Sequence, residues 1–111
     1  MMQGLRFLAS AQLTAAAASI YAPTLRFNQQ SRIGVLLVCN TDTVRRTFTL
    51  HRVLSGGSVA ASNAMWYGCP IEAGQTLPFC AETLFTLANG DALHGLADVT
   101  SKVNVFIFGD G

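Results

Sequence analysis

The chain has 111 residues, of which 50% are hydrophobic and only 12% are Asp, Glu, Lys or Arg, whereas an average soluble domain has roughly 25% charged residues. Its length fits one domain, and a formal net charge of +1 argues against a nucleic-acid partner or an acidic membrane surface. No apolar run approaches the roughly 20 residues of a membrane-spanning helix, so we expect much of the surface to be covered by other protein.

The first segment, residues 1–12, is expected to be either an extended N-terminal arm or a first edge strand, followed by a single β-sandwich domain over residues 13–111. Ser10 and Gln12 interrupt its apolar run, which argues against a secretory signal peptide. The alanine-rich residues 13–18 suit a helix by propensity, but the residues that follow them favour a strand, which ends before Pro23.

The chain is organised around residues 33–40, which are apolar at both odd and even positions. Because a strand points alternate residues to opposite faces, this pattern predicts a central strand covered on both faces. Residues 46–53 alternate instead, with Phe48 and Leu50 on one side. We expect these two segments to pair as a hairpin through the polar turn at residues 40–43.

The rest of the chain continues the pattern of short strands and turns. A helical turn or loop is expected at residues 59–63, and Pro70 marks an edge strand because it cannot donate a ladder hydrogen bond. Further strands are predicted at residues 64–71, 76–80, 91–97 and 102–108. About seven or eight short strands with Gly, Asn and Asp turns predict an all-β protein, an antiparallel β-sandwich or jelly roll.

Residue types that carry chemistry are few and scattered. Cys39, Cys69 and Cys80 lie in apolar strands without a CxxC pair, so we expect reduced core thiols rather than disulfides or a zinc site. His51 and His94, the only histidines, do not make the His-x-His set of a cupin-type metal site. Without a nucleophile, base or carboxylate pair, we expect no catalytic residue, no cofactor, no metal and no enzyme activity.

Six motifs follow one another along residues 10–109. They are Tyr21-Ala22-Pro23-Thr24, Val38-Cys39-Asn40-Thr41, Thr47-Phe48-Thr49-Leu50, Trp66-Tyr67 followed by Pro70-Ile71-Glu72-Ala73-Gly74-Gln75-Thr76, Leu87-Ala88-Asn89-Gly90-Asp91 and Val103-Asn104-Val105-Phe106-Ile107-Phe108-Gly109. In their order and spacing they resemble a family of small virion structural proteins of tailed phages. Residues 25–30 depart from that family, whose members place a Pro-Ala-Gly turn there. The resemblance implies a β-sandwich with a structural role in the virus particle.

On this resemblance we expect a capsid decoration or cement protein, made in the cytoplasm of the bacterial host and located in the virion. Its expected partners are the major capsid protein or other virion proteins and copies of itself, with a trimer favoured. A tail, neck or baseplate subunit is the first alternative, and a carbohydrate-binding module for host attachment is the second. The candidate interface residues are the outward apolar and aromatic side chains Phe7, Leu8, Phe27, Trp66, Tyr67 and Phe85.

Overall fold

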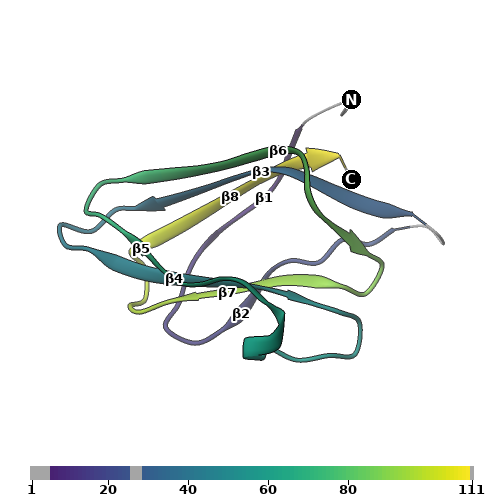
Figure 1. Ribbon diagram of the computed structural model, residues 1–111, viewed down its shortest axis with the longest axis horizontal. Coiled ribbons are helices and arrows are strands. Elements are labelled where there is room, and N and C mark those ends of the chain that lie inside the picture. The colour runs from purple at the N-terminus through teal and green to yellow at the C-terminus, as the bar shows by residue number, and fades with distance from the viewer. Residues whose placement is uncertain (1–5, 26–28, 111) are drawn as a thin grey trace.

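The computed structural model describes residues 6–25 and 29–110, which form strands joined by short loops (Figure 1). The elements are β1 (Arg6–Gln12), β2 (Ala18–Tyr21), β3 (Gln30–Asn40), β4 (Arg46–Val53), the short 3₁₀ helix η1 (Ala61–Asn63), β5 (Ala64–Ile71), β6 (Thr76–Ala88), β7 (Ala92–Ala97) and β8 (Val103–Asp110). No helix in this described part is long and apolar enough to cross a membrane.

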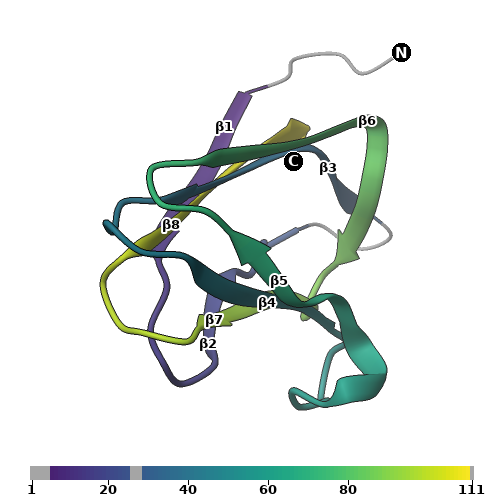
Figure 2. The same cartoon turned by 60° about the vertical axis from the view of Figure 1, so that its left-hand side comes forward.

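The strands form two stacked antiparallel sheets of four strands each. The first sheet has the order β1-β8-β3-β6 and the second has the order β2-β7-β4-β5. Figures 1 and 2 show them as two layers, with η1 beyond the second sheet. Pairs that follow each other along the chain, such as β1 and β2 or β7 and β8, are split between the layers, which is the strand order of a jelly roll. The predicted all-β sandwich is therefore confirmed.

The predicted hairpin of residues 33–40 with residues 46–53 is wrong. β3 pairs with β6 and β8 in the first sheet, whereas β4 pairs with β5 and β7 in the second. Residues 41–45 form an arch from one layer to the other. Alternation identifies the inward side of a strand but does not say to which sheet the strand belongs, so the pattern could not reveal the arch.

β6 is a single strand where the sequence predicts a shorter one ending at residue 80. Val35 lies opposite Cys80 and Ile33 lies opposite Phe85, so residues 81–84 bulge out of the ladder with β3 and interrupt the alternation. The strand predicted before Pro23 is present as β2, whereas the alanine-rich residues 13–17 ahead of it form neither a helix nor a strand. The predicted helical turn is present as η1, and β5, which contains Pro70, is an edge strand as expected.

β1 pairs with β8 over its whole length, so residues 6–12 form an edge strand of the sandwich. Between the sheets lies one core of fully buried aliphatic and aromatic side chains, contributed by both layers. Its largest members are Phe48, Ile33, Leu36, Leu50, Ile71, Leu87, Leu93 and Ile107. The accessible surface is 5887 Å², close to the roughly 5,900 Å² expected for a folded monomer of this mass.

The prediction that β3 is covered on both faces is wrong for the chain alone. Ile33, Leu36 and Val38 point inward and are fully buried. Val35 and Leu37 point outward and are only half-buried. β3 is thus a central strand with one face in the core and an apolar face directed away from it.

Candidate functional site

The outward side of the first sheet carries three apolar or neutral rows of residues, each running across β1, β8, β3 and β6. Strand register defines the rows, and alternation with the buried residues Leu36, Val38, Val105 and Ile107 shows that they point outward. In strand order the rows are Phe7, Phe108, Val35 and Cys80, then Ser10, Phe106, Leu37 and Pro78, then Gln12, Asn104, Cys39 and Thr76. We call this surface the outer face.

Aromatic side chains from two neighbouring strands dominate the outer face. Phe7 is 56% exposed and Phe106 is 37% exposed. The Phe7 and Phe108 rings meet edge to face, with 5.8 Å between centroids and 68° between planes. A folded chain gains little by holding such rings in water, so this surface is suited to contact with an apolar partner.

Beside Phe106 the outer face is hollowed. An open depression of about 360 Å³ is lined by Ser10, Ala11, Gln12, Asn104 and Phe106. The surface therefore offers both an exposed ring and an adjacent space that could receive one.

A polar border lies next to the row that begins with Phe7. Arg32 on β3 and Asp110 on β8 are directly opposite each other, and their side chains form an ion pair of 3.2 Å. At the other end, Gln12 and Asn104 supply neutral polar groups. An apolar centre with a polar border is the usual composition of a protein–protein interface.

The corresponding side of the second sheet is covered in part, over His51, by the chain's own loop. Residues 54–63 follow β4, and Asn63 in η1 places its Oδ1 2.9 Å from Nδ1 of His51, which is 3% exposed. Figure 1 shows η1 on the side of β4 and β5 that faces away from the first sheet. On the outer face, in contrast, the described residues leave Phe106 37% exposed and Leu37 only half-buried.

The predicted interface residues do not lie on one surface of the structure. Phe7 lies on the outer face, whereas Leu8 occupies a bulge in β1 and packs against the core. Tyr67 is 74% exposed but belongs to β5 in the second sheet. Phe27 lies outside the described residues.

Trp66 and Phe85 pack against other side chains of the same chain. The Trp66 ring lies 5.0 Å from Phe79 and 6.5 Å from Phe85, measured between centroids, so β5 and β6 meet through aromatic contacts. We therefore leave Trp66 and Phe85 out of the candidate site.

Sequence reasoning missed Phe106, Phe108 and Leu37 as surface residues. The sequence contains a pattern that could have identified them, because β3 and β8 both carry apolar residues at odd and at even positions. Two adjacent strands of this kind make a sheet that is apolar on both sides.

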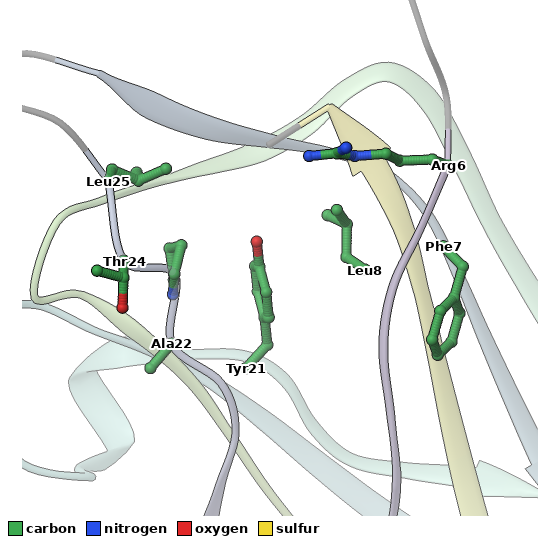
Figure 3. A pocket seen from close by; sticks show the side chains of 8 residues that line it. Arg6, Phe7, Leu8, Tyr21, Ala22, Thr24 and Leu25 are labelled. Atoms are coloured by element: carbon green, nitrogen blue, oxygen red, sulfur yellow. The ribbon is translucent and has the colours of Figure 1, made fainter.

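A second hollow, of about 340 Å³, lies between β1 and the segment after β2. It is lined by Arg6, Phe7, Leu8, Tyr21, Ala22, Pro23, Thr24 and Leu25. Figure 3 shows Arg6 extending across its upper side above the Tyr21 ring, and the Tyr21 hydroxyl lies 3.1 Å from Oγ of Ser31. This hollow is open, and it adjoins the outer face through Phe7.

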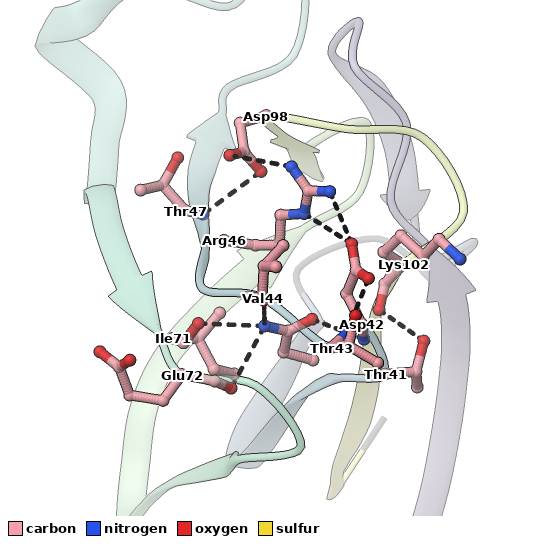
Figure 4. Close-up of polar contacts among 11 residues, drawn as sticks. Thr41, Asp42, Thr43, Val44, Arg46, Thr47, Ile71, Glu72, Asp98 and Lys102 are labelled. Carbon is pink, nitrogen blue, oxygen red and sulfur yellow. Dashed lines mark hydrogen bonds and ion pairs between the residues drawn. The ribbon is translucent and has the colours of Figure 1, made fainter.

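Charged groups gather at the arch between β3 and β4 rather than on the outer face (Figure 4). The Nη2 and Nε atoms of Arg46 lie 2.6 and 2.8 Å from Oδ2 of Asp42, and Nη1 lies 3.8 Å from Oδ2 of Asp98. The hydrogen bond from Arg46, together with one from the backbone N–H of Thr43, holds the pKa of the Asp42 carboxyl below its usual value. This cluster fixes the arch.

The three thiols are unpaired, but they are not the core thiols expected from the sequence. Cys39 and Cys80 point outward on the outer face, and Cys80 is exposed, while Cys69 is half-buried on β5. The described residues bring no three His, Cys, Asp or Glu side chains together in a way that could hold a metal ion.

Comparison of the chain with protein-family models, with curated proteins and with solved structures found no match.

Proposed function

We propose that this protein is a non-enzymatic structural subunit of a tailed-phage particle, a decoration or cement protein that acts through protein–protein contacts. The observation that carries the proposal is the outer face, an uncharged surface with apolar and aromatic residues at its centre and without a single Asp, Glu, Lys, Arg or His in its three rows. A surface of this composition supports binding to protein better than binding to a charged ligand.

The mechanism is linkage between binding and shell stability. A small subunit that binds the assembled lattice, and not its separated components, stabilises the assembly by its binding free energy. Burying apolar side chains contributes roughly 25 cal/mol per Å², so rings such as Phe7 and Phe106 are the expected source of that energy. The apolar outer face and the low charge content thus serve the same purpose.

The virion setting rests on the motif resemblance described above and on an analogy of fold. Jelly rolls occur in viral capsid proteins, and also in lectins and cupins, so fold alone does not determine function. A cupin-type metal site is not supported by the positions of the histidines, because His51 is bound to Asn63 beneath the η1 loop.

The test is quantitative mass spectrometry of purified particles that carry the wild-type protein, Phe106→Asp or Tyr67→Asp. Tyr67 is the matched control, since it is an exposed aromatic residue on the other sheet. We expect on the order of hundreds of copies per particle for the wild type and for Tyr67→Asp, and a loss of at least tenfold for Phe106→Asp. Absence of the wild-type protein from particles would overturn the proposal.

The copy number per particle distinguishes a head protein from a tail protein, because tail and baseplate rings hold about a dozen copies or fewer.

The carbohydrate-binding alternative is favoured by one observation, the exposure of Tyr67. That ring stands alone, however, because Trp66 beside it packs against Phe79 and Phe85. A glycan array on which Tyr67→Ala abolishes binding would support this second function.

A further inference from the structure

We infer that the occupant of the outer face is a second copy of this chain, packed face to face in a two-fold dimer. The inference rests on the proposed function only in taking the outer face as a protein-contact surface. It adds the identity of the partner and the symmetry of the contact. The dimer is then the unit that is incorporated into the particle, and the energy assigned above to Phe7 and Phe106 acts between two copies rather than between one copy and the lattice.

The absence of charge from the outer face favours a second copy as its occupant. In a two-fold contact the same patch lies on both sides, so any charge near the axis meets its own like charge. The three rows contain no Asp, Glu, Lys, Arg or His, and the ion pair of Arg32 with Asp110 lies beyond them. A second copy can therefore cover the rows without bringing like charges together, whereas recognition of a different protein usually uses complementary charges.

The shape of the outer face also favours a second copy. The Phe106 ring in the middle row is 37% exposed and lies at the side of the depression that Ser10, Gln12 and Asn104 also line. Two copies related by a two-fold axis near Phe106 would each place this ring against the depression of the other. The outer face thus contains both parts of a self-complementary contact, the Phe106 ring and the depression that would receive it.

The area of the outer face suits a weak contact between two copies. Four strands about 4.8 Å apart and three rows about 6.8 Å apart cover roughly 400 Å² per copy, or about 800 Å² in total. This area is below that of most stable interfaces, so we expect a weak, reversible dimer with a dissociation constant on the order of tens of micromolar.

The symmetry of this contact distinguishes a dimer from a trimer. A closed trimer needs two different patches on each copy, one donating and one receiving, whereas a single self-complementary patch closes at two. The outer face is one continuous patch across four strands. The two-fold dimer therefore replaces the trimer favoured from the sequence resemblance as the oligomer to test.

The experiment measures the mass of the full-length protein by light scattering and sedimentation equilibrium at several concentrations, with reductant to keep Cys39 and Cys80 as thiols. We expect the wild type and Tyr67→Asp to approach twice 11.8 kDa, and Phe106→Asp to remain at 11.8 kDa. If Phe106→Asp does not fold, as judged by circular dichroism, Phe7→Asp takes its place, because Phe7 is still more exposed.

Native cysteines supply a second readout. We expect the wild-type dimer to protect Cys39 and Cys80 from alkylation at least threefold relative to Phe106→Asp, with Cys69 reacting equally in both. Protection of Cys69 alone would contradict the assignment of the interface.

A wild-type protein that stays monomeric up to about 100 µM, or that has the mass of a trimer, would overturn the two-fold dimer. The proposed function is judged separately by the particle experiment. A wild-type monomer whose Phe106→Asp variant is lost from particles would mean that another virion protein occupies the outer face.

Discussion

At the scale of single residues, Asn40 determines where the chain leaves the first sheet. Its side chain is fully buried, and its Nδ2 lies 2.9, 3.1 and 3.2 Å from the carbonyl oxygens of Val44, Ile71 and Glu72. Its Oδ1 accepts a hydrogen bond of 2.9 Å from the backbone N–H of Asp42. One amide thus ties the arch to the end of β5, which an apolar side chain of the same size could not do.

We expect Asn40→Ala to lower the free energy of unfolding by about 2–4 kcal/mol, because it leaves buried carbonyl groups without donors. Urea denaturation monitored by the fluorescence of Trp66 measures the change. Thr43→Ala, an exposed position on the same arch, is the control and should change stability by less than about 0.5 kcal/mol. Equal stability of the two variants would show that the amide does not hold the arch.

Asp42 gives the arch a pH dependence with a definite sign. Its pKa is lowered in the folded protein, chiefly by the hydrogen bond from Arg46, whereas in the unfolded chain it returns to about 4. The stabilisation is therefore fully present above about pH 4 and is lost as the pH falls through the lower folded value.

We expect the wild type to be more stable than Asp42→Asn at pH 7, and the difference to shrink as the pH falls below about 4. Urea midpoints of both proteins at pH 7, 4 and 3 measure it, and the other carboxyl groups cancel because both variants carry them. A difference that stays constant to pH 3, or grows, would contradict the role given to Asp42.

At the scale of elements, β5 shows how one strand divides its aromatic residues. Trp66 faces Phe79 and Phe85 of β6, and the next residue, Tyr67, faces away. Neighbouring residues of a strand point to opposite faces, which is the division that the structure shows. The Trp66, Phe79 and Phe85 rings connect β5 and β6, which are edge strands of different sheets and are not joined by β-ladder hydrogen bonds.

We expect Trp66→Ala to cost about 2–4 kcal/mol of unfolding free energy, since it removes a half-buried ring and leaves Phe79 and Phe85 partly uncovered. Tyr67→Ala on the same strand should cost less than about 0.5 kcal/mol. Far-UV circular dichroism in urea is the measurement, because Trp66 is the sole tryptophan. A Tyr67 variant as unstable as the Trp66 variant would reverse the assignment of inward and outward faces.

What could be predicted from the sequence at this scale is the position of most strands rather than their partners. β5 has the predicted bounds, and β4 agrees because Phe48 and Leu50 alternate with polar residues. The arch could not be predicted, because the buried hydrogen bonds of Asn40 depend on β5, about 30 residues away. The bulge at residues 81–84 was hidden for the same reason, since only the register with β3 reveals it.

At the scale of the whole molecule, the low charge content and the uncovered outer face are two aspects of one composition. Arg32, Arg46 and Arg52 form ion pairs within the chain, at the ends of strands or beside turns. The apolar outward residues Val35 and Leu37 are left without a cover from the described chain. The sequence predicted a cover on both faces of β3, and the described chain supplies only the inner one.

The jelly roll also pairs its first described strand, β1, with its last, β8. Arg6 pairs with Gly109 and Gln12 pairs with Asn104, so β1 closes the first sheet on the C-terminal strand. The inward residues Ala9 and Leu8 add to the core beside β2. An N-terminal arm, in contrast, would make no such contacts within its own chain.

We therefore expect deletion of residues 1–12 to abolish the cooperative urea transition, or to lower its midpoint strongly, because it strips β8 of its edge partner and opens the core. A domain of this size has only about 5–15 kcal/mol of stability, so the loss of one strand from a four-stranded sheet takes up much of it. Deletion of residues 1–5 is the control, since it keeps every pair of β1 with β8. If residues 13–111 unfolded at the same urea concentration as the full chain, β1 would be an arm in solution and the sandwich would be complete with seven strands.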